Sequence, residues 1–324
     1  MNINTKIKNA IIFGAGGQDG YYLSKILLEK NYDVFGTFYE KGTEREQSLR
    51  KLGVKTLTCD VTNASRMSEI LTSIKPLEVY NLSGKSSVHD SWNKPLLYLQ
   101  TNALSVVSML EILTDPKLNL HHTKFFQASS SEIFGDTGIN PANEKNPICP
   151  SSPYAVSKAI SHQTVQLYRN TYKRFFVSGL LFNHESPLRD TNFLSKKIVT
   201  GAVRIAKGQA SEIKLANLDN RRDWSFAGDV MRAAWMMLQH EEPEDFIIAS
   251  GQSKSVEEFA QVVFNILGFK NWAKYIKLDI NLARTNNIKT IQADPSKAHS
   301  ELGWLPQFSF EQLVMHLVES ELKS

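Results

Sequence analysis

Short apolar runs alternate with longer amphipathic stretches through the first half of this 324-residue chain. Between the first two runs, the segment YYLSKILLEK places Leu23, Ile26 and Leu27 on one helical face, and Asn31 can end that helix in a left-handed conformation. The strand-like runs occupy residues 10–13, 34–37, 56–58, 78–82 and 124–127. Such alternation predicts an α/β fold with a doubly wound parallel sheet, because parallel strands need long crossovers and helices usually form them.

A glycine triplet follows the first predicted strand. Gly14, Gly17 and Gly20 form GxxGxxG at the mouth of the first predicted helix. Glycine permits a tight turn, and a helix N-terminus offers amide donors to a pyrophosphate, so the motif predicts a Rossmann-type dinucleotide site; an ordinary glycine-rich turn is the alternative. Asp60 and Val61 follow the third predicted strand and are placed to contact adenine, while helix capping is the alternative role of Asp60.

The second predicted strand bears on which dinucleotide binds. Phe38 stands about where an NAD site often carries an acid for the ribose hydroxyls, and Glu40 follows two places later. Lys41 and Arg45 come next and are placed to face a 2′-phosphate. We therefore predict NADP as the cofactor, with NAD as the alternative.

The alternation weakens after about Asn183, where polar loops lie around Asp190 and at 217–222. We interpret this region as a smaller C-terminal substrate-binding part, interleaved with late strands of the sheet. The predicted dinucleotide-binding domain covers 1–183, with 225–250 returning to it, and the substrate-binding part covers 184–224 and 251–324. No repeat or low-complexity linker marks a boundary, so we expect both parts to pack as one body.

Composition is that of an ordinary globular protein. Hydrophobic residues make up 42% of the chain and charged residues 22%, and a net charge of +4 is too small to imply nucleic acid binding. Cys59 and Cys149 have no metal-ligand spacing, so we expect neither a disulfide scaffold nor a metal site. The N-terminus lacks a signal-peptide pattern, and we expect no apolar stretch that approaches the roughly 18 residues needed to cross a bilayer. These features predict a cytoplasmic protein without a nucleic acid or membrane partner.

Tyr154 and Lys158 form a YxxxK pair in the segment SSPYAVSKA. Ser151 or Ser152 can cap this predicted helix, and Pro153 suits its first turn. The spacing of four stacks the tyrosine and the lysine on one helix face. An ammonium beside a phenol lowers the phenol pKa from about 10, so Tyr154 can serve as a base near neutral pH.

With this pair and the glycine triplet, the chain resembles the extended short-chain dehydrogenase/reductase superfamily over nearly its whole length, and most of all its GDP-mannose 4,6-dehydratase branch. The segments that carry the resemblance are GQDGYYL (17–23), YNLSGKSSVHDSW (80–92), QASSSEIFG (127–135), SPYAVSK (152–158), LFNHESPLR (181–189), NLDNRRDW (217–224), PEDFIIASG (243–251) and DPSKAHSELGW (294–304). The cofactor-binding residues that it implies are Gly14, Gly17, Gln18, Asp19, Gly20, Asp60, Val61, Leu82, Tyr154 and Lys158.

Glu132 follows three serines at what reads as the buried end of the fifth predicted strand, where burial penalises a charge. The resemblance implies that Ser130 binds the sugar O4 and that Tyr154 takes the O4 proton as a hydride leaves C4 for the cofactor. Glu132 then removes the C5 proton and assists loss of water from C6, before the hydride returns to C6. The implied catalytic residues are Ser130, Glu132, Tyr154 and Lys158. A carboxylate that accepts backbone amides at a helix start is the alternative for Glu132.

The resemblance also implies the substrate and the assembly. Asn183 matches an amide that holds the substrate near its phosphates, and Arg222 and Arg284 match guanidinium groups that contact the diphosphate. Ser87 and Lys197 complete the predicted substrate-binding residues. The implied enzyme is a GDP-sugar 4,6-dehydratase that binds its cofactor tightly, forms a homodimer or homotetramer and acts by default on GDP-mannose.

The chain departs from the family pattern at several positions. Ser130 stands where the family usually has threonine, Asn287 replaces a ribose-binding glutamate, and Tyr39 and Glu40 replace basic residues that read the NADP phosphate. The dehydration chemistry survives these changes, whereas GDP-N-acetylglucosamine or a GDP-heptose becomes an alternative substrate. An epimerase or 4-ketoreductase in which Glu132 is idle, and a non-catalytic NAD(P)-binding regulator, are the alternative functions.

Overall fold

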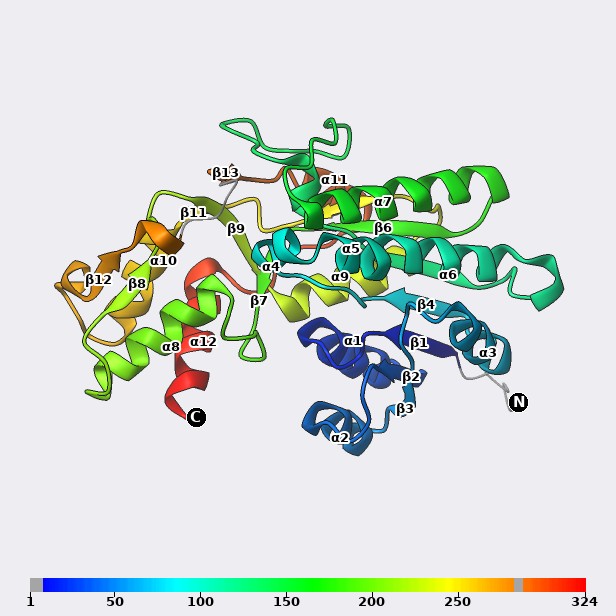
Figure 1. The fold of residues 1–324 in the computed structure, drawn as a ribbon, viewed down its shortest axis with the longest axis horizontal. Helices are drawn as coiled ribbons and strands as arrows, with labels where there is room; N and C mark the ends of the chain where they lie inside the picture. The colour runs from blue at the N-terminus through cyan, green and yellow to red at the C-terminus, as the bar shows by residue number, and fades with distance from the viewer. Residues whose placement is uncertain (1–7, 283–287) are drawn as a thin grey trace. The chain divides into compact units, whose positions relative to one another are not determined.

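The computed structural model, which describes residues 8–282 and 288–324, contains a seven-stranded sheet (Figure 1). Its strand order is β10-β6-β5-β4-β1-β2-β3, and the pairs from β6 to β3 are parallel. The strands are β1 (Asn9–Phe13), β2 (Asp33–Phe38), β3 (Lys55–Thr58), β4 (Glu78–Asn81), β5 (Lys124–Ala128), β6 (Phe176–Leu181) and β10 (Phe246–Ile248). This architecture confirms the predicted α/β fold, and each of the five predicted strands is present.

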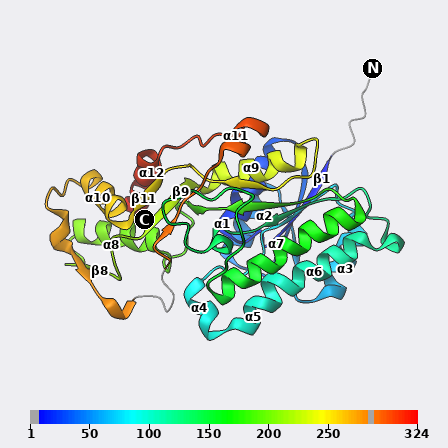
Figure 2. The same cartoon turned by 90° about the horizontal axis from the view of Figure 1, so that it is seen from above.

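Helices cover both faces of this sheet. Figure 2 shows α3 (Ala64–Ile74), α6 (Ser105–Thr114) and α7 (Pro153–Tyr172) on one face, and α1 (Gln18–Glu29) and α9 (Ala227–Gln239) on the other. On the first face, apolar side chains of the helices and strands form one core, which includes Ile11, Phe13, Met67, Leu71, Val79, Val106, Leu110, Phe125 and Val165. Such two-sided coverage explains why these strands read as continuous apolar runs.

A helical segment of 20 residues, Pro95–Thr114, is long and apolar enough to cross a membrane, so the expectation that no stretch approaches that length is wrong. It consists of α5 (Pro95–Leu99), the π-helical turn η1 (Gln100–Leu104) and α6. Half of its most apolar window is buried inside the fold, and α6 contributes Val106 and Leu110 to the core of the sheet. The segment therefore has the character of a core helix.

The chain divides into two compact units. Unit 1 comprises Met1–Ile133, Ile148–Leu180 and Met231–Phe246, and unit 2 comprises Phe134–Pro147, Leu181–Val230 and Ile247–Ser324. The assignment of cofactor binding to one predicted domain and substrate binding to the other stays a prediction.

Unit 2 is built on the strand β9 (Arg221–Phe226), which pairs with three short strands: β7 (Asn183–Glu185), β11 (Ser253–Ser255) and β13 (Thr290–Ile291). Trp224 of β9 lies in its apolar core, with its ring 5.0 Å from Phe259 and 6.1 Å from Phe310. Unit 2 also contains α8 (Leu194–Ala206), α10 (Val256–Ile266), α11 (Ser296–Glu301), α12 (Phe310–Leu322), β8 (Ile213–Leu215) and β12 (Ile276–Leu278).

Candidate active site

The glycine-rich turn between β1 and α1 has the geometry that a dinucleotide phosphate requires. Gly14 has a φ of +81°, and a Cβ on it would lie 2.7 Å from the Ser83 backbone. A Cβ on Gly20 would overlap the backbone of Ala15. Gly17 is the N-cap of α1 and has no side chain that could cap the helix. The positive end of the helix is therefore formed by backbone amides alone. These residues fit a bound pyrophosphate.

The turn lies where the strand order of the sheet changes direction. In the sheet, β2 and β3 lie on one side of β1, and β4, β5 and β6 lie on its other side. Leu82 continues β4 beside this point, and its amide donates to the Phe13 carbonyl at 3.0 Å. Ligands of open α/β sheets bind at such a switch point, at the carboxyl ends of the strands. The structure therefore brings the glycine motif and Leu82 together at the expected edge.

Asp60 and Val61 also follow a strand at this edge. The Asp60 carboxylate accepts hydrogen bonds from the Thr62 amide at 2.9 Å and the Thr62 hydroxyl at 2.8 Å. Asn63, and not Asp60, caps α3 by accepting from the Arg66 amide at 2.9 Å. The alternative role of Asp60 as a helix cap is therefore wrong.

Of the two basic residues predicted to face a 2′-phosphate, Arg45 contacts the glycine-rich turn. It lies in the first turn of α2 (Glu44–Leu52), and its guanidinium donates to the Gly16 carbonyl at 3.4 Å. Glu46 braces the preceding loop by accepting from the Gly42 amide at 2.6 Å. Lys41 and Glu40 are exposed on that loop. The contacts therefore favour Arg45 over Lys41 as a residue near the cofactor.

Helix α7 begins as its sequence predicts. Ser152 is the N-cap and accepts from the Ala155 amide at 3.1 Å, and Pro153 occupies the first turn. Tyr154 and Lys158 follow four residues apart and are 8% and 7% exposed. Both side chains, which the sequence predicts to be catalytic, therefore project from a capped helix into a buried environment.

Burial lowers the pKa of the Lys158 ammonium. Its Nζ donates to the Ala128 carbonyl at the end of β5, at 2.8 Å. Desolvation lowers the pKa of Lys158 from 10.5 to about 8, although the charge of Asp19 in the first turn of α1 opposes the shift. Asp19, a predicted cofactor residue, thus lies within electrostatic range of Lys158. Near neutral pH the ammonium stays charged and can favour the Tyr154 phenolate.

Ser130 and Glu132 lie directly after β5, in and beside the 3₁₀ turn η3 (Ser131–Phe134). Ser130 is 7% exposed, and its hydroxyl accepts from the Glu132 amide at 3.3 Å. Glu132 is only partly buried, so the expectation of a carboxylate in a buried strand end is wrong: the backbone has already turned. Within residues 8–282 and 288–324, the Glu132 carboxylate accepts no hydrogen bond. This geometry favours the catalytic role over the alternative of a carboxylate that binds backbone amides.

The buried amide of Asn102 in η1 is hydrogen-bonded to α7, a contact that our sequence reasoning missed. Its Oδ1 accepts from the Lys85 amide at 2.8 Å, and its Nδ2 donates to the Lys85 carbonyl at 2.9 Å and to the Ser157 hydroxyl at 3.0 Å. Ser157 in turn donates to the Tyr154 carbonyl at 2.7 Å. The available signal was an asparagine inside an apolar helix, since a buried amide needs partners.

The predicted substrate residues fall in both units. Ser87 of unit 1 caps α4 (Val88–Asn93) and accepts from the Asp90 amide at 3.1 Å. In unit 2, Asn183 begins β7, and Lys197 is partly buried on α8. Arg284 lies outside the described residues.

Arg222 has a structural role that the sequence did not reveal. Its guanidinium donates to the carbonyls of Arg221 at 2.7 Å, Lys289 at 3.2 Å and Ile288 at 3.0 Å. Arg222 is 8% exposed, and these contacts join β9 to the segment that leads into β13. Its predicted contact with a diphosphate stays a prediction.

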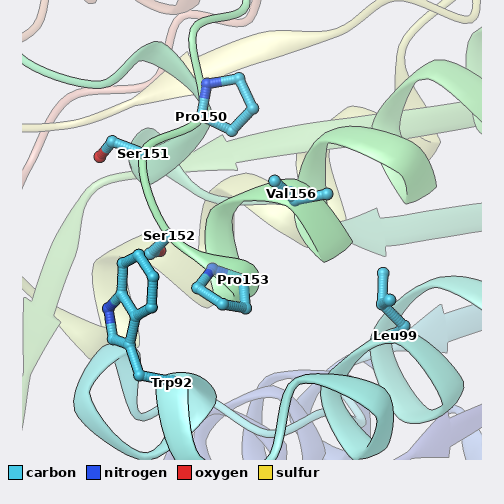
Figure 3. Close-up of a pocket in the computed structure, with 7 residues that line it drawn as sticks. All are labelled: Trp92, Leu99, Pro150, Ser151, Ser152, Pro153 and Val156. Carbon is cyan, nitrogen blue, oxygen red and sulfur yellow. The ribbon is translucent and has the colours of Figure 1, made fainter.

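A cavity of about 410 Å³ lies on the outer side of the start of α7 (Figure 3). Figure 3 shows the Trp92 indole beside Ser152 and Pro153, with Leu99 and Val156 further along the opening. Tyr154, Ser130 and Glu132 do not line it. The lining of this cavity therefore does not include the predicted catalytic side chains.

Solved structures of a nucleotide-sugar epimerase and a nucleotide-sugar dehydratase share this fold. The structure of a UDP-glucose 4-epimerase from Thermotoga maritima matches with a TM-score of 0.85 at 21% identity, over 97% of this chain and 99% of that one. A dTDP-glucose 4,6-dehydratase from Bacillus anthracis, in complex with NAD, matches with a TM-score of 0.84 at 21% identity, over 98% and 97%.

Sequence comparison identifies the family of the chain. The family model described as GDP-mannose 4,6 dehydratase matches residues 11–317. GDP-mannose 4,6 dehydratase 2 from Arabidopsis thaliana is 39% identical over 98% of this chain and 87% of its own length. GDP-mannose 4,6-dehydratase from Vibrio cholerae is 36% identical over 98% and 94%. The chain belongs to the GDP-mannose 4,6-dehydratase family.

Proposed function

We propose that this protein dehydrates GDP-mannose to the GDP-4-keto-6-deoxy sugar. The observation that carries the proposal is the Glu132 carboxylate, which lies two residues after the buried Ser130 hydroxyl and accepts no hydrogen bond from the described residues. A carboxylate in that state is ready to accept a proton from a substrate. The relatives from Arabidopsis thaliana and Vibrio cholerae support GDP-mannose as the substrate.

The residues of the glycine-rich turn, together with Asp60, Val61 and Leu82, would hold the cofactor. We propose NADP, because Arg45 contacts the glycine-rich turn, and NAD remains the alternative. When bound, the cofactor would supply a hydride acceptor for C4 of the sugar and a hydride donor for C6. The net reaction consumes no reductant.

The first half of the cycle requires a base at the O4 hydroxyl. Tyr154 accepts the O4 proton while Ser130 donates a hydrogen bond to the same oxygen. Lys158 is charged below about pH 8 and stabilises the phenolate from the next turn of the helix. Oxidation at C4 makes the neighbouring C5 proton acidic.

The second half requires one group that acts first as a base and then as an acid. Glu132 accepts the C5 proton, and its carboxylic acid donates a proton to the C6 hydroxyl, which leaves as water. Electrons from the C5–H bond form the C5–C6 double bond. Hydride addition at C6 would then be matched by a proton that Tyr154, which holds the one taken from O4, returns to C5. The product would be the 4-keto-6-deoxy sugar, so the substrate would have lost one water.

We propose that Ser87, Asn183, Lys197, Arg222 and Arg284 bind the GDP-sugar. Arginine and lysine suit a diphosphate because they donate charged hydrogen bonds, and serine and asparagine suit hydroxyl groups. GDP-N-acetylglucosamine and a GDP-heptose remain the alternative substrates.

We also propose a cytoplasmic homodimer or homotetramer. Large apolar side chains are exposed on neighbouring helices of unit 1: Leu96 (73%) on α5, Leu104 (57%) on η1, and Leu167 (62%) and Tyr172 (51%) on α7. A second copy of the chain is a natural partner for such a surface. Light scattering of the purified protein, with Leu104→Glu as the variant expected to dissociate, tests this assembly.

The function is tested by the mass of the product. Purified protein with bound cofactor is incubated separately with GDP-mannose, GDP-N-acetylglucosamine, a GDP-heptose, dTDP-glucose and UDP-glucose. Loss of one water from GDP-mannose without net change in the cofactor supports the proposal. A product of unchanged mass would indicate an epimerase. Net cofactor reduction, with a product two hydrogens lighter, would indicate a 4-ketoreductase acting in reverse, and no turnover with tight cofactor binding would indicate a regulator.

A further inference from the structure

The segment that follows β4 connects the glycine-rich turn to the predicted catalytic lysine within unit 1. At its start, the Ser83 backbone lies 2.7 Å from the place that a Cβ on Gly14 would occupy. One residue later, a Cβ on Gly84 would lie 3.7 Å from the Lys158 Nζ. Lys85 comes next in the chain. It is therefore one residue from the contact with Lys158 and two residues from the contact with the turn.

A buried amide holds the backbone of Lys85 on both sides. Asn102 is 1% exposed, and its Oδ1 accepts from the Lys85 amide at 2.8 Å while its Nδ2 donates to the Lys85 carbonyl at 2.9 Å. The same Nδ2 donates to the Ser157 hydroxyl of α7 at 3.0 Å. Lys85 is thus fixed through its backbone to the predicted catalytic helix. A preorganised backbone lowers the entropic cost of binding a ligand.

The side chain of Lys85 has no role in the fold itself. The residue is exposed, and within the described ranges, 8–282 and 288–324, its ammonium forms neither an ion pair nor a hydrogen bond. A lysine ammonium offers three donors. An ordinary surface lysine has a free side chain too, but Lys85 combines it with a fixed backbone at the edge of the sheet where ligands bind.

A phosphate group is the ligand chemistry that suits this position. Lysine binds a phosphate as a compact point charge. Lys85 follows β4, which pairs with β1 at the switch point of the sheet, beside the turn that fits a pyrophosphate. The two ligands of the proposed function, the dinucleotide cofactor and the GDP-sugar, each carry two linked phosphates.

We infer that Lys85 is a binding residue whose ammonium contacts a phosphate group of a bound nucleotide, in the cofactor or in the GDP-sugar. The inference rests on the proposed function, which supplies these two ligands, and it adds a residue to their binding site. Its contribution is to affinity, because the proposed chemistry at C4, C5 and C6 uses other side chains.

The test compares Lys85→Gln and Lys85→Arg with the wild-type enzyme, each with its bound cofactor. Calorimetric titration with GDP measures affinity for this nucleotide without turnover. If Lys85 contacts the phosphates of the GDP-sugar, Lys85→Gln loses a charged hydrogen bond and its Kd for GDP rises about tenfold. Lys85→Arg keeps the positive charge, so its Kd for GDP stays within about threefold of the wild-type value.

A second measurement tests the cofactor as the source of the phosphate. The enzyme is diluted, and the cofactor that remains bound is separated by gel filtration over time and quantified. If Lys85 contacts the cofactor, Lys85→Gln releases it about tenfold faster while the Kd for GDP stays unchanged. For whichever nucleotide Lys85 contacts, added salt weakens binding less in Lys85→Gln than in the wild type, because the screened charge is absent.

Lys117→Gln is the matched control. Lys117 is another exposed lysine of unit 1, and its amide also bonds a side chain, the Asp115 carboxylate, at 2.8 Å. It lies in η2 (Pro116–Leu118), which precedes the start of β5, whereas Lys85 follows the end of β4. The control removes the same charge, and we expect wild-type affinity for both nucleotides.

The outcomes separate this inference from the proposed function. If the wild-type protein binds both nucleotides but does not dehydrate GDP-mannose, the proposed function fails, and the comparison of affinities still tests Lys85. Weaker binding of GDP or of the cofactor in Lys85→Gln alone, restored by Lys85→Arg, supports the inference and identifies the nucleotide. Wild-type affinity of Lys85→Gln for both nucleotides would overturn it. An equal loss in Lys117→Gln would also overturn it, because any lost surface charge would then have the same effect.

Discussion

Two buried charged side chains lie at opposite edges of the parallel sheet and are held in different ways. At the amino edge, Glu78 of β4 accepts from the Tyr32 hydroxyl at 2.9 Å, the Tyr80 hydroxyl at 2.7 Å and the Gln239 amide at 3.0 Å. At the carboxyl edge, the Lys158 ammonium donates a hydrogen bond to the Ala128 carbonyl. Among the described residues it makes no other hydrogen bond. The carboxylate is saturated, whereas the ammonium keeps donors for a ligand.

Burial therefore has different consequences at the two edges. At the amino edge it keeps the hydrogen-bond donors of Glu78 neutral, and at the carboxyl edge it lowers the pKa of Lys158. Desolvation raises the pKa of Tyr32 to about 12 and that of Tyr80 well above its usual value, so both remain neutral donors to Glu78. Desolvation makes the charged form of Lys158 costly, so its pKa falls to about 8. Incomplete pairing of a buried charge is a common mark of a functional site.

The largest expected effect is on activity at the carboxyl edge. Tyr154→Phe removes the proton acceptor, so hydride transfer from C4 falls about a thousandfold. Reduced-cofactor absorbance in a single turnover measures this step. Tyr80→Phe is the matched control, because it removes a buried hydroxyl at the amino edge and leaves turnover intact. Unchanged hydride transfer in Tyr154→Phe would remove Tyr154 from its role.

Glu78→Ala has the next largest effect and acts on stability alone. It leaves three buried donors without their acceptor, so the free energy of unfolding falls by about 4 kcal/mol. Urea unfolding measures the loss, and kcat at a temperature where the variant is folded stays at the wild-type value. A large drop in kcat there would show that the two edges are not separate in function.

Lys158 makes stability depend on pH in the alkaline range. Its pKa is about 8 in the folded protein against a reference of 10.5, so the unfolded chain binds more protons between these values and stability rises with pH there. The rise is about 3 kcal/mol. Lys158→Met removes it, is more stable than the wild type at pH 7, and loses activity. Urea unfolding at pH 7 and pH 10 checks the sign; an equal rise in the variant would assign it to other groups.

The smallest expected effect concerns the cap of the catalytic helix. Ser152→Ala removes the acceptor for the Ala155 amide and lowers the free energy of unfolding by about 1 kcal/mol. Ser309→Ala, at the cap of α12, is the matched control with a similar loss of stability. Thermal unfolding compares the two variants. If kcat falls only in Ser152→Ala, the cap also orients Tyr154; if it falls in both, the loss reflects instability.

Local chemistry made much of this molecule predictable. The apolar runs gave the strands, and Asn31 adopts the predicted left-handed φ of 61°. Ser152 and Pro153 begin the catalytic helix as their residue types suggest. Each of these features depends on residues within a few positions, where steric and hydrogen-bonding preferences act directly.

Features set by distant contacts could not be predicted. Asn102 meets Ser157 across 55 positions, and Gln239 meets Glu78 across 161. Arg222 was assigned to a diphosphate by its motif, yet its guanidinium contacts carbonyls 66 and 67 residues away. The segment Pro95–Thr114 is apolar enough for a membrane, yet its α6 part packs into the core beside the sheet. Tertiary packing decides such contacts, and no short window of sequence contains them.

The central claim, that Glu132 turns a sugar-oxidising site into a dehydratase, is tested most directly by Glu132→Gln incubated with GDP-mannose. We expect reduced cofactor and a GDP-sugar oxidised at C4 that retains its C6 hydroxyl, with no loss of water by mass. The amide cannot accept the C5 proton, whereas Tyr154 and Lys158 remain in place. Dehydrated product at the wild-type rate would contradict the account.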